Sequence, residues 1–143
     1  MSRAARLLAE VATPLALAAA ALALYLPSLD APWVWDDGLA IVQNPNLRRL
    51  WPLSEALSAP SFAPVTGRPT VSLSLALNYA LTGLEPAGFR AGNLLIHALA
   101  ALALCGVVRR TLELPDPPER FAGAARGLAF SSALLWLVHP LVT

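Results

Sequence analysis

Residues 11–29 read VATPLALAAAALALYLPSL, a run of 19 residues without a charged side chain. As a helix with about 1.5 Å of rise per residue, this run would span roughly 28 Å, close to the thickness of a bilayer core. A cleaved signal peptide is the alternative, but its apolar core has about 7–15 residues and precedes a pair of small residues. The run is longer, follows Arg3 and Arg6, and ends in Leu-Pro-Ser-Leu. It therefore favours an uncleaved first membrane helix.

Two more apolar runs occupy residues 91–108 and 127–143. Each contains one histidine, His97 in the first of them and His139 in the second. The runs are rich in alanine and leucine and do not alternate with polar residues, which indicates helices in lipid rather than strands of a barrel. The third run stops where the chain stops, so we expect further spans to be missing.

The composition also favours a membrane protein. Hydrophobic residues make up 57% of the chain and charged residues 13%, whereas a soluble domain carries roughly 25% charged residues. The net charge of +1 gives no indication of a nucleic-acid partner. The single cysteine, Cys105, cannot form an internal disulfide and is expected to be a small packing residue. The predicted fold class is an all-α, polytopic membrane helix bundle with three transmembrane helices.

The orientation in the membrane depends on residues 69–84, an uncharged segment that is slightly short for a span. If this segment crosses, the arginines of residues 109–126 face outward. If it does not cross, the N-terminus and residues 109–126 are cytoplasmic, and residues 30–90 form an outer loop. Arginines are then denser on the cytoplasmic side, as membrane proteins prefer. We therefore predict a multi-pass protein with a cytoplasmic N-terminus and a non-crossing segment.

The outer loop is expected to contain short interfacial helices. Residues 70–82 are predicted to form one of them, with Gly83 as its stop. Pro52 is predicted to open another, because proline suits the first helical turn. Tryptophans are frequent in the same loop and commonly lie at the level of the lipid headgroups.

Asp36 and Asp37 form an acidic pair in the outer loop, within the sequence WVWDDG of residues 33–38. Either carboxylate could act as a general base, or the pair could hold a divalent cation. The alternative is a solvated turn, since Asp-Gly is a common turn dipeptide.

Polar residues inside the apolar runs add to this candidate site. His97 follows Asn93 by one helical turn, and ionisable residues in a span usually face the bundle and mark function. The alternative for His97 is a neutral imidazole bonded to another helix. His139 lies near the end of the third run, on the predicted outer side. The acidic pair and these residues therefore converge on one face of the membrane.

Several short motifs, taken in order, resemble one family. From about residue 29 onward the chain is similar to multi-spanning proteins that carry tetratricopeptide repeats and are related to the protein O-mannosyltransferases, of the GT-C glycosyltransferase superfamily. The resemblance rests on Trp35-Asp36-Asp37, Asn44-Pro45, Gly67-Arg68-Pro69, Leu73-Ser74, Leu77-Asn78-Tyr79, Gly83-Leu84, Pro86, Gly88-Phe89, Asn93-Leu94-Leu95-Ile96-His97 and His139-Pro140-Leu141.

The resemblance implies a GT-C-like fold and an enzyme that moves a sugar, expected to be mannose, from a polyprenyl-phosphate donor to a protein hydroxyl on the outer or luminal face. It places the catalytic carboxylate at Asp36 or Asp37, with Asp37 the expected base. Arg68 is a candidate for the lipid phosphate, because a guanidinium suits that group. Arg90 stands where the family often has histidine, and it is a second phosphate candidate.

The resemblance also implies that the repeats are missing and that this part alone is inactive. The expected partners are membrane lipid, the donor and a protein acceptor, in a bacterial inner membrane or, in a eukaryote, the endoplasmic reticulum. Two alternatives stay open. One is a GT-C transferase that acts on lipid or polysaccharide, and the other is a non-catalytic membrane scaffold.

Overall fold

The structure is a computed structural model that describes residues 3–114, 121 and 123–139, with the side chains of residues 3–7 and 9 left out. All regular elements in this part of the chain are helical, which confirms the predicted all-α class. The chain divides into two compact units. Unit 1 comprises Met1–Pro27 and Leu94–Thr143, and unit 2 comprises Ser28–Asn93.

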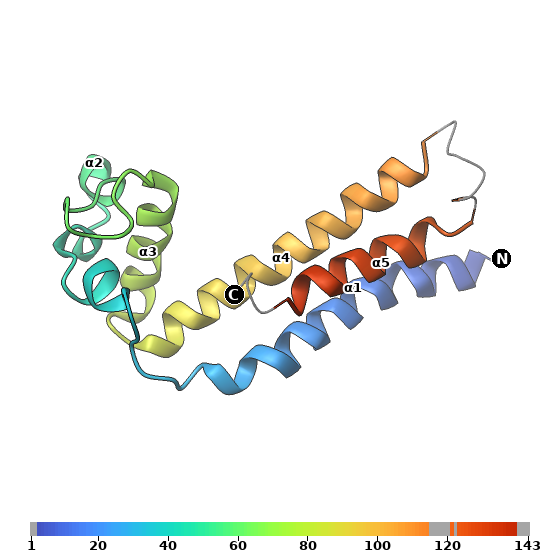
Figure 1. The fold of residues 1–143 in the computed structure, drawn as a ribbon, viewed down its shortest axis with the longest axis horizontal. Coiled ribbons are helices and arrows are strands. Elements are labelled where there is room, and N and C mark those ends of the chain that lie inside the picture. Colours follow the sequence, from blue (N-terminus) through green and yellow to red (C-terminus); the bar gives the residue numbers. More distant parts are fainter. Residues whose placement is uncertain (1–2, 115–120, 122, 140–143) are drawn as a thin grey trace. The chain divides into compact units, whose positions relative to one another are not determined.

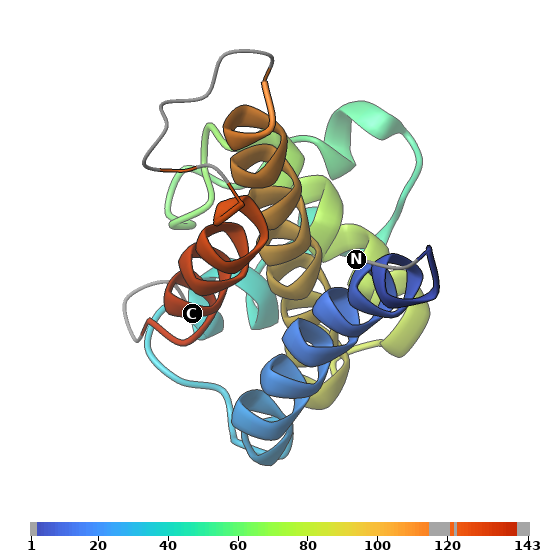
Figure 2. The same ribbon diagram turned by 90° about the vertical axis from the view of Figure 1, so that its right-hand side faces the viewer.

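Unit 1 contains three apolar helices. They are α1 (Arg3–Tyr25), the C-terminal part of α4 (Pro86–Leu112) and α5 (Ala125–Leu137), which are labelled in Figure 1 and seen from a second side in Figure 2. The contacts between α1, α4 and α5 are made mostly by small side chains, which allow close helix packing. The buried members of this core are Leu17, Ala21, Ala101, Cys105, Ala129, Ala133 and Leu137.

Two helical segments are long and apolar enough to cross a membrane. They are Glu10–Ser28, with a mean hydropathy of 1.7, and Pro86–Leu112, with 2.0. Only 11% and 17% of their apolar windows are buried, whereas the core helix of a soluble protein is mostly buried. Large exposed side chains such as Leu15 and Leu99 therefore form surfaces that suit lipid. The helix α5 has 13 residues and covers part of the third predicted span, whose residues 140–143 lie outside the described part.

The helix α4 extends beyond the predicted span of residues 91–108 at both ends. It begins at Pro86, in the favoured first position of a helix. At its other end, Arg109 and Arg110 lie in the last turn, where positive charge interacts favourably with the helix dipole. The predicted cytoplasmic loop of residues 109–126 is shorter as a result, since α4 ends at Leu112 and α5 begins at Ala125.

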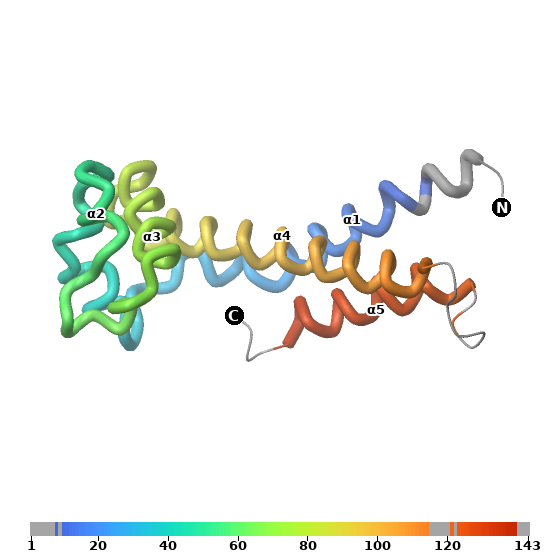
Figure 3. Tube along the Cα trace, turned by 90° about the horizontal axis from the view of Figure 1, so that it is seen from above, coloured from blue at the N-terminus to red at the C-terminus, as the bar shows by residue number. Residues whose placement is uncertain are grey.

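Unit 2 is a small fold of short helices, shown as a tube in Figure 3. Its elements besides the start of α4 are η2 (Gly38–Val42), η3 (Pro45–Arg48), α2 (Leu53–Ala56) and α3 (Pro69–Thr82). The helix α3 confirms a helix over residues 70–82, and α2 confirms the short helix after Pro52. Gly83 ends α3 with φ 64°, a conformation that glycine adopts readily.

The core of unit 2 lies between η3, α2 and α3. Leu47, Ala76 and Phe89 are among its most buried residues. Arg48 connects η3 to α3, because its guanidinium lies 4.5 Å from the ring centre of Tyr79. It also connects η3 to η2, because its Nη2 donates to the Val42 carbonyl at 2.6 Å. The core is small, so each large side chain in it contributes a substantial share of the stability of the unit.

Candidate functional site

The acidic pair lies in a hydrogen-bonded turn, residues 34–40, which we call the acidic turn. The Asp37 carboxylate oxygen Oδ2 accepts a hydrogen bond from the Val34 N–H at 3.0 Å. The Asp36 carbonyl accepts the N–H groups of Leu39 at 3.0 Å and Ala40 at 2.8 Å. The backbone of both acids is thus fixed, and the Asp37 side chain is oriented by its own turn. Asp36 is exposed and Asp37 is partly buried.

Trp35, directly before the acidic pair, has an unusual conformation. Its φ is 49°, in the left-handed region that bulky residues rarely adopt, and 98% of its surface is exposed. Holding such a residue in this region costs about 1–3 kcal/mol, and backbone strain of this kind gathers at functional sites. The acidic turn therefore presents an exposed indole beside Asp36.

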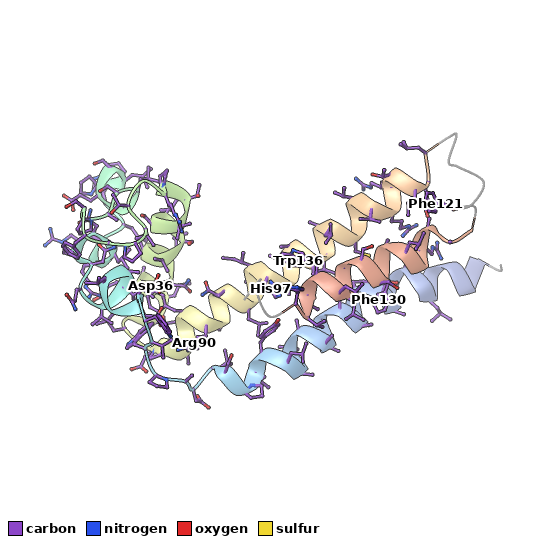
Figure 4. The ribbon with its side chains drawn as sticks, in the orientation of Figure 1. Asp36, Arg90, His97, Phe121, Phe130 and Trp136 are labelled. Atoms are coloured by element: carbon purple, nitrogen blue, oxygen red, sulfur yellow. The ribbon has the colours of Figure 1, made fainter. Side chains whose placement is uncertain are left out.

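Arg90 and Phe89, at the start of α4, hold the segment that leads into the acidic turn. Figure 4 labels Arg90 and Asp36. The Arg90 guanidinium donates from Nε to the Ala31 carbonyl at 3.2 Å and from Nη2 to the Pro32 carbonyl. Phe89 is 2% exposed and meets the Trp33 ring edge-on at 5.4 Å. Arg90 is therefore a positioning residue for the turn, and its remaining N–H groups are what it could offer to a phosphate.

Arg68 and Asn93 are both exposed. Arg68 precedes α3, and no hydrogen bond or ion pair of its guanidinium occurs among the described residues. Within the same residues, no three His, Cys, Asp or Glu side chains lie close enough together to hold a metal. The predicted roles of Arg68 and Asn93, and a divalent cation at the acidic pair, stay predictions.

His97 takes part in a polar cluster of unit 1. Its Nε2 lies 2.9 Å from the Leu137 carbonyl, which also accepts the Tyr25 hydroxyl at 2.7 Å. The Tyr25 ring meets the imidazole edge-on at 5.4 Å, and Trp136 lies 4.7 Å from it. Because the last carbonyls of a helix lack intrahelical partners, these two donors satisfy the end of α5. These contacts support the packing interpretation of His97.

The remaining histidine, His139, is exposed and follows α5, with its N–H donated to the Trp136 carbonyl at 3.2 Å. Asp36, Asp37 and Arg90 all belong to unit 2, and Arg90 bonds the backbone just before the acidic turn. His97 and His139 belong to unit 1, so the predicted convergence of all the polar residues on one site stays a prediction.

The shared carbonyl predicts a coupling between Tyr25 and His97. We expect Tyr25→Phe and His97→Leu each to lower the free energy of unfolding of unit 1 by about 0.5–1.5 kcal/mol. The double variant should lose more than the sum, because only then is the Leu137 carbonyl left without either donor, a loss of about 1–3 kcal/mol. Denaturant unfolding of the chain in detergent measures all three values.

A control pair separates this coupling from general weakening. Thr111 is exposed, and its bond among the described residues lies within α4, to the Val107 carbonyl at 2.9 Å. Tyr25→Phe combined with Thr111→Val should be additive within about 0.5 kcal/mol. If the losses in free energy of unfolding were additive for Tyr25→Phe and His97→Leu as well, the Leu137 carbonyl would not be a shared acceptor.

Sequence reasoning missed two sets of residues that the structure singles out. Tyr25 lies near the end of an apolar run and is the last residue of α1, and an aromatic side chain with a polar tip at that position is a signal for a helix-end hydrogen bond. Glu10, Arg109 and Arg126 are the charges that flank the three apolar runs at one end, and they meet as ion pairs. Their shared position at the ends of the runs could have predicted that contact.

Comparison with known proteins gives matches over most of the chain. No family model and no solved structure matches it. Protein O-mannosyl-transferase TMTC1 of Mus musculus is 39% identical over 136 residues, 89% of this chain and 13% of the relative. The human TMTC1 is 35% identical over 136 residues, 89% of this chain and 14% of the relative. Protein O-mannosyl-transferase Tmtc1 of Drosophila melanogaster is 32% identical over 130 residues, 85% of this chain and 14% of the relative.

The chain thus spans only 13–14% of the length of these relatives. The matches confirm the resemblance that the motifs predicted, and with the two long apolar helices they indicate a membrane protein. Over most of its length, this chain is similar in sequence to proteins named protein O-mannosyl-transferases.

Proposed function

We propose that the complete gene product transfers mannose from a polyprenyl-phosphate donor to a hydroxyl of a protein acceptor, and that the acidic turn supplies the general base. The names of the relatives support mannose and a protein acceptor. The observation that carries the role of the turn is the Asp37 carboxylate, which is oriented by the Val34 N–H through one oxygen. Its other oxygen has no hydrogen bond with the described residues and is the one proposed to accept a proton.

The proposed reaction is a direct displacement at the anomeric carbon. The acceptor oxygen forms a bond to that carbon while the bond from the carbon to the phosphate oxygen breaks. Asp37 takes the hydroxyl proton, and polyprenyl phosphate leaves with the electron pair. A positioned base contributes typically about 10²–10⁴-fold to such a step. Asp36 orients its neighbour, and Arg68 is the proposed contact for the donor phosphate, which a guanidinium binds in a bidentate manner.

The reaction requires the acidic turn to face the outer or luminal side. The denser arginines of residues 1–10 and 109–126 support a cytoplasmic N-terminus and a multi-pass topology. In a Cys105→Ala background, we expect Ser61→Cys to react with a membrane-impermeant maleimide in intact cells, and Leu114→Cys to react only after permeabilisation. Both positions are exposed in the structure, so access to the thiol does not distinguish them. Labelling of position 114 in intact cells would show the opposite orientation.

The acceptor is tested by incubating membranes that contain the complete gene product with labelled polyprenyl-phosphate mannose. We expect the label to appear in protein and to be released by cleavage of the O-glycosidic bond. Label that appears in lipid or polysaccharide would instead support a transferase for those acceptors. No transfer by a well-expressed, correctly inserted protein would support a membrane scaffold.

A further inference from the structure

The three helices of unit 1 line a cavity of about 310 Å³, open at the surface, at the end of the bundle that carries the arginines. Its walls include apolar side chains from each helix, Pro14 of α1, Leu102 of α4 and Ala129 of α5. Its charged lining residues are Glu10, Arg109 and Arg126. The cavity is therefore amphipathic, with an apolar interior and a charged rim.

The charged rim is not satisfied by its own contacts. Arg109 and Arg126 both approach the same oxygen of Glu10, each at 3.6 Å, which is longer than the 2.7–2.9 Å or so of a good charge-assisted hydrogen bond. Arg109 has a better partner in Glu113, at 3.0 Å. The Arg126 nitrogen Nη1 is buried and has no hydrogen-bond partner among the described residues. A buried donor without a partner is costly, and a small rotation of the guanidinium toward an acceptor in the cavity would restore the missing hydrogen bond.

The position of the rim along the helices points to a lipid headgroup. Arg109 lies in the last turn of α4, Arg126 in the first turn of α5, and Glu10 just before the first apolar run. All three thus lie where apolar helix gives way to polar residues, which is the level of the headgroups. Pockets with basic residues between membrane helices at this level bind lipid headgroups.

The charges of the rim select among headgroups. Two guanidinium groups can hold a phosphate, whereas the Glu10 carboxylate would repel an acidic headgroup and can accept a hydrogen bond from an ammonium group. Glu10 is half exposed, so an ammonium can reach it. The volume corresponds to roughly ten water molecules, which accommodates a phosphate joined to a short amine of about eight non-hydrogen atoms.

We propose that this cavity binds the headgroup of a zwitterionic phospholipid with a primary amine. Its phosphate accepts from Arg126 and Arg109 in place of Glu10 Oε1, the oxygen that both approach at 3.6 Å, and its ammonium binds the displaced Glu10 carboxylate. The acyl chains lie along the exposed apolar faces of α1 and α4. This site is independent of the proposed transferase reaction and of the acidic turn in unit 2.

The test measures which lipid stays bound to the purified chain by native mass spectrometry, after exposure to phosphatidylethanolamine, phosphatidylcholine or phosphatidylglycerol. We expect about tenfold stronger retention of phosphatidylethanolamine, the effect of one charge-assisted hydrogen bond. The quaternary amine of phosphatidylcholine cannot donate to Glu10, and phosphatidylglycerol lacks an amine. Equal retention of the three lipids would overturn the proposal without the use of any variant.

Two variants assign the contacts. Arg126→Gln should lower the retention of all three lipids about tenfold, because each of them carries a phosphate. Glu10→Gln should lower only the retention of phosphatidylethanolamine, to the level found for phosphatidylcholine. The control is Arg110→Gln, an exposed arginine in the same turn of α4 that does not line the cavity, and circular dichroism checks that each variant is helical. An equal loss in Arg110→Gln would indicate non-specific attraction and would contradict a built site.

Two further outcomes would also overturn the proposal. Displacement of the lipid by millimolar inorganic phosphate would indicate a site for free phosphate, because the acyl chains would then contribute nothing. Absence of the phosphatidylethanolamine preference in the complete gene product would indicate that another segment of the protein fills the cavity.

Discussion

Asp37→Asn in the complete gene product is expected to lower the rate of sugar transfer by at least about two orders of magnitude. An amide cannot take up the acceptor proton, so the contribution of the general base is lost. The substitution should leave the fold unchanged, since the amide oxygen of the new side chain can still accept the Val34 N–H that Asp37 accepts at 3.0 Å. Transfer of labelled mannose in membranes, at matched protein levels, measures the effect.

The neighbouring acid provides the matched comparison. Asp36 is exposed, and its carboxylate makes no hydrogen bond or ion pair with the described residues. If Asp36 only orients its neighbour, Asp36→Asn should lower transfer less than Asp37→Asn does. A larger loss in Asp36→Asn would reverse the two roles. Wild-type rates of transfer in both variants would support the alternative interpretation, in which the acidic pair is a solvated turn without a catalytic role.

Phe89→Ala is expected to lower the free energy of unfolding of unit 2 by about 3–5 kcal/mol. Phe89 is 2% exposed, lies in the core of the unit and packs against Trp33. A domain of this size has only a few kcal/mol to lose, so unit 2 should unfold in this variant. Proteolysis within residues 28–93 in detergent, compared with the wild type, measures the change.

Phe62→Ala is the control, because it removes the same side chain from a site that is 54% exposed. Its effect should stay within about 0.5 kcal/mol, as for other surface substitutions. Equal protease resistance of Phe89→Ala and the wild type would contradict the packing described for unit 2. Unfolding of unit 2 in Phe89→Ala would also displace the acidic turn. The rate of mannose transfer is therefore expected to depend on the stability of this core.

The sequence was sufficient for the positions of the helices, because local patterns determine them. The apolar runs predicted α1, α4 and part of α5, and proline and glycine predicted the start of α2 and the end of α3. The ends of α4 differ from the predicted span because a bilayer core limits only the apolar length. Polar residues such as Arg109 can continue a helix beyond it.

Side-chain partners could not be predicted in the same way, because they connect residues far apart in the chain. Arg90 was a candidate for phosphate, yet its guanidinium binds the backbone of residues 31 and 32. His97 was a candidate for a cavity, yet it shares the Leu137 carbonyl with Tyr25. In both cases a backbone carbonyl is the acceptor, and the sequence carries no signal for which carbonyl is free.

The central claim is that the acidic turn takes part in mannose transfer to protein. It is tested most directly by transfer of label from polyprenyl-phosphate mannose to protein, in membranes with the wild type or with Asp36→Asn and Asp37→Asn combined. Protein amount and the labelling of Ser61→Cys in both backgrounds establish equal insertion. We predict transfer by the wild type and at least about a hundredfold less by the double variant. Equal transfer by the two proteins would contradict the account.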